Sequence, residues 1–334
     1  MSKPEISVIV CAHNQVFIHE FVASVKNSIG VTYEIIVISS DPTLTSIPGC
    51  FVTNGPPLPA AKRNMGARLA KAPLLAFFDD DTAIDPDCLL QYKVFMDTHP
   101  FAGMAYGKLH KGDEPHRFDE AGGYLTSTGF IWSRAGQNIV DTGQYDNPVQ
   151  IFAGKSASCI IRTNLFNLIG GFDEDFGILG EESDLSWRVW LNGQQVWYVP
   201  QAHGIHWFNT KRKITKRHYT SSRVQYNGSR NYCTMLVKNL EGANLCRILP
   251  VHLVIWFTAG LAMIGTLKIR EGVNIWRGLY YVGRNIGKIL AKRKRVQRAR
   301  RVSDAAIWPS IYRQAPRGYY KQRIMRYLTF GLHG

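Results

Sequence analysis

Acidic residues are almost absent from the C-terminal part of this 334-residue chain. From Ile205 to Gly334 there are 3 Asp/Glu against 26 Lys/Arg, which is a net charge of +23. From Met1 to Gly204 there are 22 Asp/Glu against 14 Lys/Arg, a net charge of −8, so that the whole chain carries +15. The sequence therefore joins an acidic body to a strongly basic segment, and the two need separate explanations.

The chain also lacks paired cysteines, and its opening residues predict no secretory leader. Its six cysteines form no CxxC pair and no metal-ligand spacing, which argues against a zinc site or a disulfide framework. The opening MSKPEISVIVCAH enters an apolar run that is too short for a signal peptide. We therefore expect a reducing compartment and a cytoplasmic location for the body. With 45% hydrophobic and 19% charged residues, the composition is that of a globular protein.

Apolar runs alternate with helical patterns along the body. Buried strands are predicted at 6–12, 33–39, 73–78 and 195–199, and helices at 58–72, 85–99 and 182–192, with a further helical spacing through Phe17, Phe21 and Val25. Such alternation predicts βαβ units and a parallel sheet covered on both faces. Residues 103–154, rich in Gly, Ser, Thr and aromatic side chains, are expected to form loops and irregular strands that wall a substrate site.

Three consecutive aspartates, Asp79 to Asp81, directly follow the predicted strand 73–78. Ligands of parallel sheets bind beyond the carboxyl ends of the strands, which is where these carboxylates lie. Mg²⁺ and Mn²⁺ take oxygen ligands, usually one or two carboxylates together with phosphate oxygens and water. The triplet is thus either a solvated turn or a divalent-cation site beside a diphosphate.

A second acidic cluster, Glu181, Glu182 and Asp184, stands at the start of the predicted helix 182–192. Carboxylates there gain from the helix dipole, and Asp184 has the i,i+4 spacing to pair with Arg188. The alternative is catalytic: one cluster holds a cation while the other supplies a carboxylate base for a hydroxyl nucleophile.

Four segments together resemble the family 2 glycosyltransferases of the GT-A fold, in their order and spacing. They are ISVIVCAHN (6–14), FFDDDTAIDPDCL (77–89), LIGGFDEDFGILGEESDLSWR (168–188) and GQQVWYVPQAHGIHW (193–207). Within that family the chain is similar to the rhamnosyltransferase-like branch, which builds surface glycans. The resemblance implies an α/β fold with a Rossmann-like mixed sheet flanked by helices. It also implies a nucleotide-diphosphate-sugar donor, Mn²⁺ or Mg²⁺, and a single displacement that inverts the anomeric carbon.

The resemblance also implies a role for individual residues. In the DxD element, Asp81 is implied as the main metal ligand, while Asp79 and Asp80 face the ribose or sugar and Asp79 is also a candidate for the metal. His206 is a candidate for contact with the metal or diphosphate. The acceptor and donor-sugar side is implied at Gly170, Gly171, Phe172, Asp173 and Glu181. The nucleotide side is implied at Ala12, His13, Asn14, Ser40, Asp41, Arg63 and Asn64.

Two positions depart from the family pattern. Glu182 stands where the family has an aspartate base; glutamate performs the same proton transfer but reaches one methylene further, so Asp184 is kept as a second candidate. After the second strand, Ser39 and Ser40 replace an aspartate that contacts the base in the family, with Asp41 just beyond. The nucleotide therefore stays open.

The basic segment changes character past residue 208. Residues 246–267 are apolar over nearly the length of a bilayer, but Pro250, His252 and two glycines also fit an interfacial helix. The following basic stretch interleaves aromatic and aliphatic residues with Lys and Arg, which suits anionic headgroups over 246–301. We expect a catalytic domain at 1–208 and a largely helical membrane-associating region at 209–334. No nucleic-acid partner is expected.

The sequence as a whole predicts a metal-dependent inverting glycosyltransferase. Its acceptor would be a hydroxyl of a glycan or lipid-linked saccharide at the cytoplasmic membrane face, in surface polysaccharide or glycoconjugate assembly. One alternative is a polyprenyl-phosphate glycosyltransferase, whose phosphate acceptor needs no strong base. The other is a non-catalytic protein that keeps the fold but only binds or scaffolds.

Overall fold

The computed structural model describes residues 3–13, 15–135, 139–207 and 221–321. The chain forms two compact units. The first comprises Met1–Gly123, Ser133–Gly177 and Glu181–Lys211, and the second comprises Tyr124–Trp132, Ile178–Gly180 and Arg212–Gly334.

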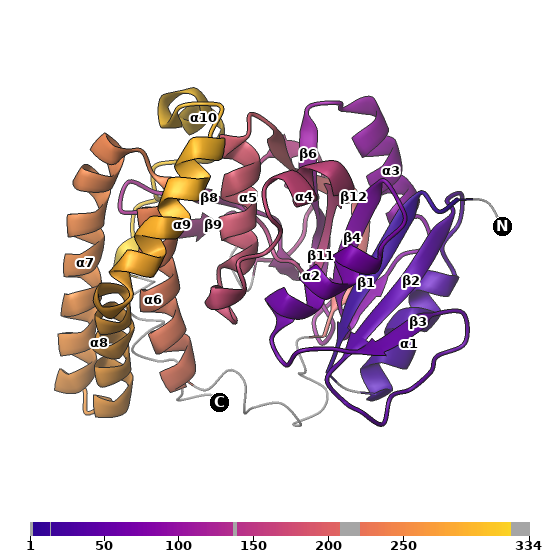
Figure 1. Cartoon of the computed structure of the whole chain (residues 1–334), viewed down its shortest axis with the longest axis horizontal. Coiled ribbons are helices and arrows are strands. Elements are labelled where there is room, and N and C mark those ends of the chain that lie inside the picture. The colour runs from indigo at the N-terminus through magenta and orange to yellow at the C-terminus, as the bar shows by residue number, and fades with distance from the viewer. Residues whose placement is uncertain (1–2, 14, 136–138, 208–220, 322–334) are drawn as a thin grey trace. The chain divides into compact units, whose positions relative to one another are not determined.

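The first unit is built on a mixed sheet (Figure 1). The strands run in the order β10-β12-β6-β11-β4-β1-β2-β3, with β5 paired to β12 and β7 to β6. Their bounds are β1 Ile6–Ala12, β2 Tyr33–Ser39, β3 Phe51–Asn54, β4 Leu74–Asp79, β5 Thr82–Ile84, β6 Ala102–Lys111, β7 Phe118–Glu120, β10 Val149–Gln150, β11 Ser158–Arg162 and β12 Gln195–His206. β3, β2, β1 and β4 are parallel, whereas β11 runs antiparallel to both β4 and β6.

Helices cover both faces of this sheet. They are α1 Gln15–Lys26, α2 Pro59–Leu69, α3 Cys88–Thr98, α4 Thr163–Leu168 and α5 Glu181–Leu191, with a 3₁₀ turn at Glu174–Phe176. All seven residues of β1 are buried, and they alternate between the two faces. Val8 and Val10 belong to the core with α1 and α3, while Ile9 lies against Gly66 of α2. The predicted two-sided burial is confirmed.

The expectation of loops and irregular strands over residues 103–154 was wrong for the first part of this region. Residues 102–111 form β6, a ten-residue strand inside the sheet, between β11 and β12. Its sequence AGMAYGKLHK has no continuous apolar run because small residues are needed there. A Cβ on Gly107 would lie 2.2 Å from the backbone oxygen of Ala202, a separation that atoms do not reach. Close packing, which the sequence pattern does not reveal, thus selects glycine at this position.

The second unit is mostly helical. Its helices are α6 Ser221–Asn239, α7 Gly242–Gly265, α8 Ile269–Arg284, α9 Ile286–Ala299 and α10 Asp304–Ile311, and the hairpin of β8 Gly123–Leu125 and β9 Ile131–Ser133 joins them. Their shared core contains Phe130, Cys233, Val237, Trp256, Met263, Ile275, Val282 and Ile289. Within the described residues, α7 is the one helix whose length and composition would let it cross a membrane.

Candidate active site

The aspartate triplet lies at the carboxyl end of β4, as predicted, and its three members do different things. Asp80 is buried and accepts a hydrogen bond of 2.6 Å from the backbone N–H of His13, so it fixes the loop after β1. Asp79 is the most accessible of the three, and Asp81 is buried. The triplet is therefore no solvated turn, because two of its three carboxylates are removed from water.

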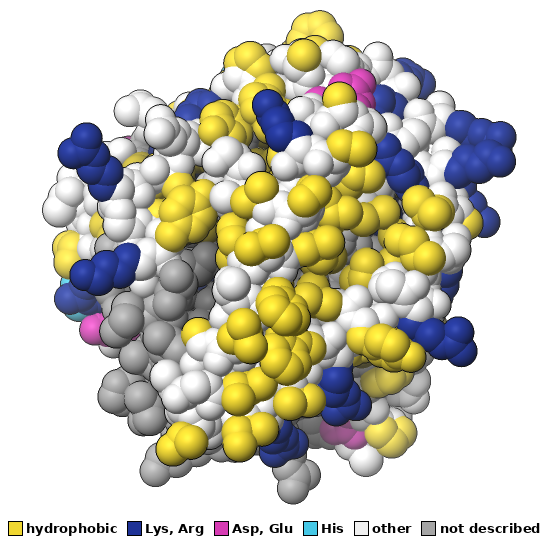
Figure 2. Space-filling view, turned by 90° about the vertical axis from the view of Figure 1, so that its left-hand side faces the viewer, with side chains coloured by type: hydrophobic (Ala, Val, Ile, Leu, Met, Phe, Trp, Pro, Cys, Tyr) yellow, Lys and Arg dark blue, Asp and Glu magenta, His cyan; other side chains and the backbone are white. Residues whose placement is uncertain are grey.

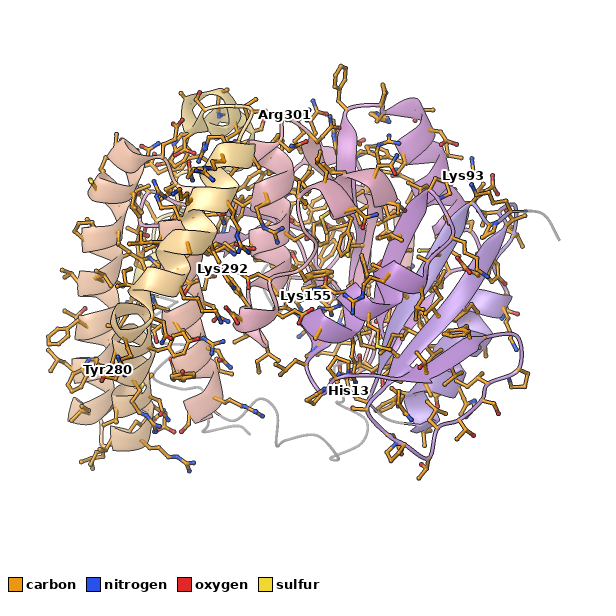
Figure 3. The ribbon with its side chains drawn as sticks, in the orientation of Figure 1. His13, Lys93, Lys155, Tyr280, Lys292 and Arg301 are labelled. Carbon is orange, nitrogen blue, oxygen red and sulfur yellow. The ribbon has the colours of Figure 1, made fainter. Side chains whose placement is uncertain are left out.

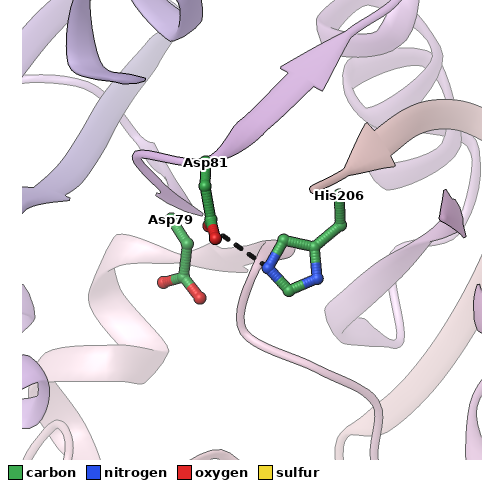
Figure 4. Close-up of side chains that lie close together, drawn as sticks. All are labelled: Asp79, Asp81 and His206. Atoms are coloured by element: carbon green, nitrogen blue, oxygen red, sulfur yellow. Dashed lines mark ion pairs between the residues drawn. The ribbon is translucent and has the colours of Figure 1, made fainter. Parts of the chain in front are cut away.

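His206, more than a hundred residues further along the chain, lies beside Asp79 and Asp81. β5 pairs with β12 so that Thr82 stands opposite His206, and the N–H of Trp207 donates to the backbone oxygen of Asp81 at 2.9 Å. His206 Nε2 lies 3.2 Å from Asp81 Oδ1. Ligand atoms of Asp79, Asp81 and His206 all lie within 4.8 Å of one another (Figure 4). Two carboxylates and one imidazole that converge in this way fit a divalent cation.

Asp119 and Lys155 support His206 from behind. Asp119 belongs to β7. Its Oδ2 lies 2.8 Å from His206 Nδ1, and its Oδ1 accepts a hydrogen bond of 2.6 Å from Lys155 Nζ. Burial alone would lower the pKa of His206, but the carboxylates of Asp81 and Asp119 outweigh it and raise this pKa to about 10. A carboxylate behind a histidine is the arrangement that orients a metal-binding imidazole. Asp119 thus fixes the ring that faces Asp81.

Arg63 connects the two acidic clusters. This buried guanidinium of α2 donates from Nη2 to Asp79 Oδ1 at 2.8 Å and from Nη1 to Glu181 Oε1 at 3.0 Å. Its cationic carbon lies 5.4 Å from the centre of the Phe172 ring. The nucleotide contact suggested by the sequence for Arg63 stays a prediction. The structure shows that Arg63 lies between two carboxylates, which keeps the ends of β4 and α5 together.

Glu182 and Asp184 lie in different surroundings, although both belong to the first turn of α5. Asp184 is fully buried and accepts a hydrogen bond of 2.9 Å from Arg188 Nε, with Arg188 Nη2 also 2.9 Å away in the ion pair, so the simple pairing considered from the sequence is what forms. Glu182 keeps partial access to solvent. Burial and the adjacent Glu181 carboxylate raise the pKa of Glu182 well above its ordinary range. Of the two, Glu182 has the surroundings of a base.

Lys62 organises the ends of β1 and β2, where the sequence predicted the nucleotide side. Its fully buried ammonium donates to the backbone oxygen of Ala12 at 2.8 Å and to Ser40 Oγ at 3.1 Å, and lies 3.2 Å from His13 Nδ1. Burial lowers the pKa of Lys62. Asp41 accepts from the N–H and hydroxyl of Thr43, which shapes the next turn. Asn14 lies outside the described residues.

Asn64 of α2 forms hydrogen bonds with the GGFDE segment, residues 170–174. Its Oδ1 accepts from the N–H of Phe172 and its Nδ2 donates to the Phe172 backbone oxygen, both at 2.9 Å. Gly170 and Gly171 both have positive φ, and a Cβ on Gly171 would meet Asn64 Oδ1 at 2.7 Å. Asp173 accepts from the N–H of Asp175 at the start of the 3₁₀ turn.

The assignment of Phe172 to the acceptor side stays a prediction, and the structure shows what its ring contacts. Its ring is buried and packs against Phe77 and Phe166, with ring centroids 5.3 and 5.7 Å apart. The Phe172 ring and the Asn64 amide therefore hold the GGFDE segment (170–174) in place.

The sequence analysis missed three side chains: Asp119, Lys155 and Lys62. Figure 3 labels Lys155 and also His13, which lies 3.2 Å from Lys62. Asp119 belongs to the region 103–154 that was expected to wall a site, and Lys155 directly follows this region, but no short motif singled either of them out. Lys62 directly precedes Arg63 and reads as an exposed helix residue. A lysine among small apolar residues, in PAAKRNMGA, was the available signal.

The family follows from comparison with known proteins. A model of the glycosyltransferase like family 2 matches residues 53–247, which is more than half of the chain. The chain belongs to this family. The match spans α2, the aspartate triplet, Glu182 and His206, so the recognised segments lie where the site is built. Among curated protein sequences, none matches.

Solved structures share the fold. One is GalNAc-T7 with UDP, GalNAc and Mn²⁺ (TM-score 0.57, 14% identity, 86% of this chain and 58% of that one). Another is the mannosyltransferase PcManGT from Pyrobaculum calidifontis in complex with GDP-Man and Mn²⁺ (TM-score 0.50, 13% identity, 98% of this chain and 85% of that one). S. aureus TarS 1-349 matches with a TM-score of 0.51 and 18% identity over 97% of this chain and 89% of that one. The chain thus spans little more than half of GalNAc-T7. These likenesses show the GT-A fold, and the family supports glycosyl transfer; the rhamnosyltransferase-like branch stays a prediction.

Proposed function

We propose that the protein is a metal-dependent, inverting glycosyltransferase that uses a nucleotide-diphosphate sugar. The observation that carries this is the convergence of Asp79, Asp81 and His206 at the carboxyl end of the sheet, in a chain of family 2. Two neighbours of the same fold were crystallised with a nucleotide or nucleotide sugar and Mn²⁺. The three residues would hold Mn²⁺ or Mg²⁺, which when bound supplies positive charge beside the donor diphosphate.

Glu182 is the proposed base. The acceptor hydroxyl gives its proton to the Glu182 carboxylate as its oxygen forms a bond to the anomeric carbon. The bond from that carbon to the phosphate oxygen breaks on the opposite face, and its electron pair leaves with the nucleoside diphosphate. The raised pKa of Glu182 suits this task, because a carboxylate with greater proton affinity is the stronger base.

The surrounding residues hold the reacting groups in place. Arg63 fixes Glu181, the residue before Glu182, to Asp79 at the donor side, so one guanidinium sets the spacing of base and donor site. Lys62 holds the loops after β1 and β2, where the nucleotide is proposed to bind. The proposed acceptor is a hydroxyl of a glycan or lipid-linked saccharide at the cytoplasmic membrane face, in surface glycan assembly.

The test is turnover of a panel of UDP-, GDP- and dTDP-sugars by the full chain with Mn²⁺, measured as release of nucleoside diphosphate. We expect Glu182→Gln to lower turnover by about 10²–10⁴-fold while donor affinity stays within about twofold, since only the base is lost. Glu182→Asp should recover part of the rate, because it restores the carboxylate. Glu114→Gln, at a partly exposed glutamate of the first unit that pairs with Lys111, serves as the matched control.

Two outcomes would contradict the proposal. If Glu182→Gln keeps most of its turnover when polyprenyl phosphate is the acceptor, the acceptor is a phosphate and no base is needed. If no donor is turned over by the wild-type chain although one binds, the protein is a binding module that retains the fold alone.

A further inference from the structure

One side of α7 presents a continuous apolar row to solvent. Val251, Val254, Phe257 and Leu261 are each between 46% and 61% exposed. Their spacing of three and four residues places them on the same side of the helix. The part of the second unit that the structure describes leaves this row uncovered.

The opposite side of α7 packs closely on α8. His252, Trp256, Gly260 and Met263 are buried there. A Cβ on Gly272 of α8 would lie 2.6 Å from the backbone oxygen of Gly260, and the Trp276 ring stacks on Phe257 with centroids 5.5 Å apart. The two helices therefore lie side by side and present one joint surface.

α8 adds an apolar row and a basic row to this surface. Ile269, Val273 and Tyr280 are exposed at spacings of four and seven residues, and Tyr280 projects away from the helix in Figure 3. Arg270, Arg277 and Arg284, also exposed, repeat every seven residues and so form a second row, roughly a quarter turn around the helix.

Basic residues dominate around the apolar rows. From residue 268 to 301 there are 12 Lys/Arg and 1 Asp/Glu. Figure 2 shows an apolar band across this face with Lys and Arg side chains at its borders and few acidic ones. An apolar strip edged with cations matches the boundary between acyl chains and anionic headgroups.

The arginine row of α8 favours a helix pair that lies flat on a membrane over one that spans it. α7 is apolar and long enough to span a bilayer. If it did so, α8 would lie beside it and Arg277, in the middle of α8, would enter the hydrocarbon core. A charge there is strongly disfavoured, whereas a pair that lies flat buries its apolar rows and keeps the arginines among the headgroups.

We propose that the face formed by Val251, Val254, Phe257 and Leu261 of α7 with Ile269, Val273 and Tyr280 of α8 docks flat on a membrane that contains anionic lipid. The partner is the bilayer surface, chosen over a second copy of the chain because two such basic faces would repel each other. This inference depends on the second unit alone and stands apart from the proposed reaction.

Flotation of the full chain with vesicles tests the docking. Phosphatidylcholine vesicles with about one phosphatidylglycerol in three should bind at least tenfold more tightly than pure phosphatidylcholine, because several cations meet the surface. Phe257→Asp should lower binding about tenfold or more, and the triple change of Arg270, Arg277 and Arg284 to Gln on the order of a hundredfold. Phe101→Asp, at an exposed phenylalanine of the first unit, should leave binding unchanged.

The proposal is overturned if Phe257→Asp and the triple arginine variant both bind vesicles as tightly as the wild type. It is also overturned if the wild type forms a concentration-dependent dimer that Phe257→Asp abolishes and does not bind vesicles. Orientation is tested by thiol labelling on sealed vesicles in a Cys50→Ser background. Cys246, exposed near the start of α7, and Gly265→Cys at its end should both react with an external impermeant maleimide. Labelling of only one of the two would show that α7 spans the bilayer.

Discussion

Removal of the Arg63 guanidinium should destabilise the first unit by an amount that the structure lets us estimate. Its bond to Glu181 joins side chains that are 3% and 7% exposed, so the charge-assisted bond contributes about 1.5–3 kcal/mol. The Asp79 side chain is 34% exposed, and solvent screening reduces that pair to about 1 kcal/mol or less. Arg63→Met should therefore cost roughly 3 kcal/mol, within the range found when one partner of a buried ion pair is lost.

The measurement is hydrogen exchange of the β1 and β4 amides at increasing urea, which reports on the first unit separately from the second. Arg68→Met, at an exposed arginine on the same helix, is the matched control and should change stability by less than about 0.5 kcal/mol. Because most of the cost is the unpaired Glu181 carboxylate, the double variant with Glu181→Gln should recover about half of it. The reasoning is refuted if Arg63→Met costs less than about 1 kcal/mol, or if the double variant is the less stable one.

Four further predictions concern the site. Since Glu182 must be ionised to act and its pKa is raised, kcat/KM should fall as pH drops through a value above about 4.3, and an unshifted ascending limb in the pH–rate profile would contradict this. For the same reason the Glu182 carboxylate destabilises the fold increasingly above its unfolded pKa, so Glu182→Gln should raise the melting temperature by a few degrees at neutral pH; scanning calorimetry that finds a decrease refutes it. Asp80→Asn keeps the size of the side chain but loses the charge-assisted hydrogen bond that Asp80 accepts from the His13 N–H. Calorimetry should therefore find nucleotide binding about tenfold weaker, and unchanged affinity would contradict this. Lys62→Met leaves Ala12 O and Ser40 Oγ without their donor, and should weaken nucleotide binding by about tenfold while metal binding in the absence of nucleotide is unaffected; an equal loss of both would refute a local role.

Short apolar runs in the sequence were enough to predict the strands that are buried on both faces. β1 and β4 are apolar throughout, and the charged triplet that follows β4 marks the edge where ligands bind. The same holds for Glu182, because the start of α5 carries an unusual density of carboxylates. In each case a few consecutive residues contain the information.

Long-range pairing was not predictable in this way. His206 reaches Asp81 only because β5 adds to β12, and Asp119 reaches His206 only through the short strand β7 beside β6. β6 itself was missed because glycines replace apolar residues where other backbone comes close. Lys62 was missed, and the carboxylate partners of Arg63 were not foreseen, since a helix sequence does not show which of its charges find buried partners.

The central claim is that Asp79, Asp81 and His206 form a metal site on which nucleotide-sugar binding depends. Calorimetry of UDP-, GDP- and dTDP-sugars with Mn²⁺, Mg²⁺ or EDTA, on the wild type, Asp81→Ala and the exposed control Asp97→Ala, tests it most directly. The account predicts that one nucleotide binds tightly only with metal present, that Asp81→Ala loses this dependence together with at least tenfold in affinity, and that Asp97→Ala behaves as wild type. Binding of the same strength in EDTA, or in Asp81→Ala, would contradict it.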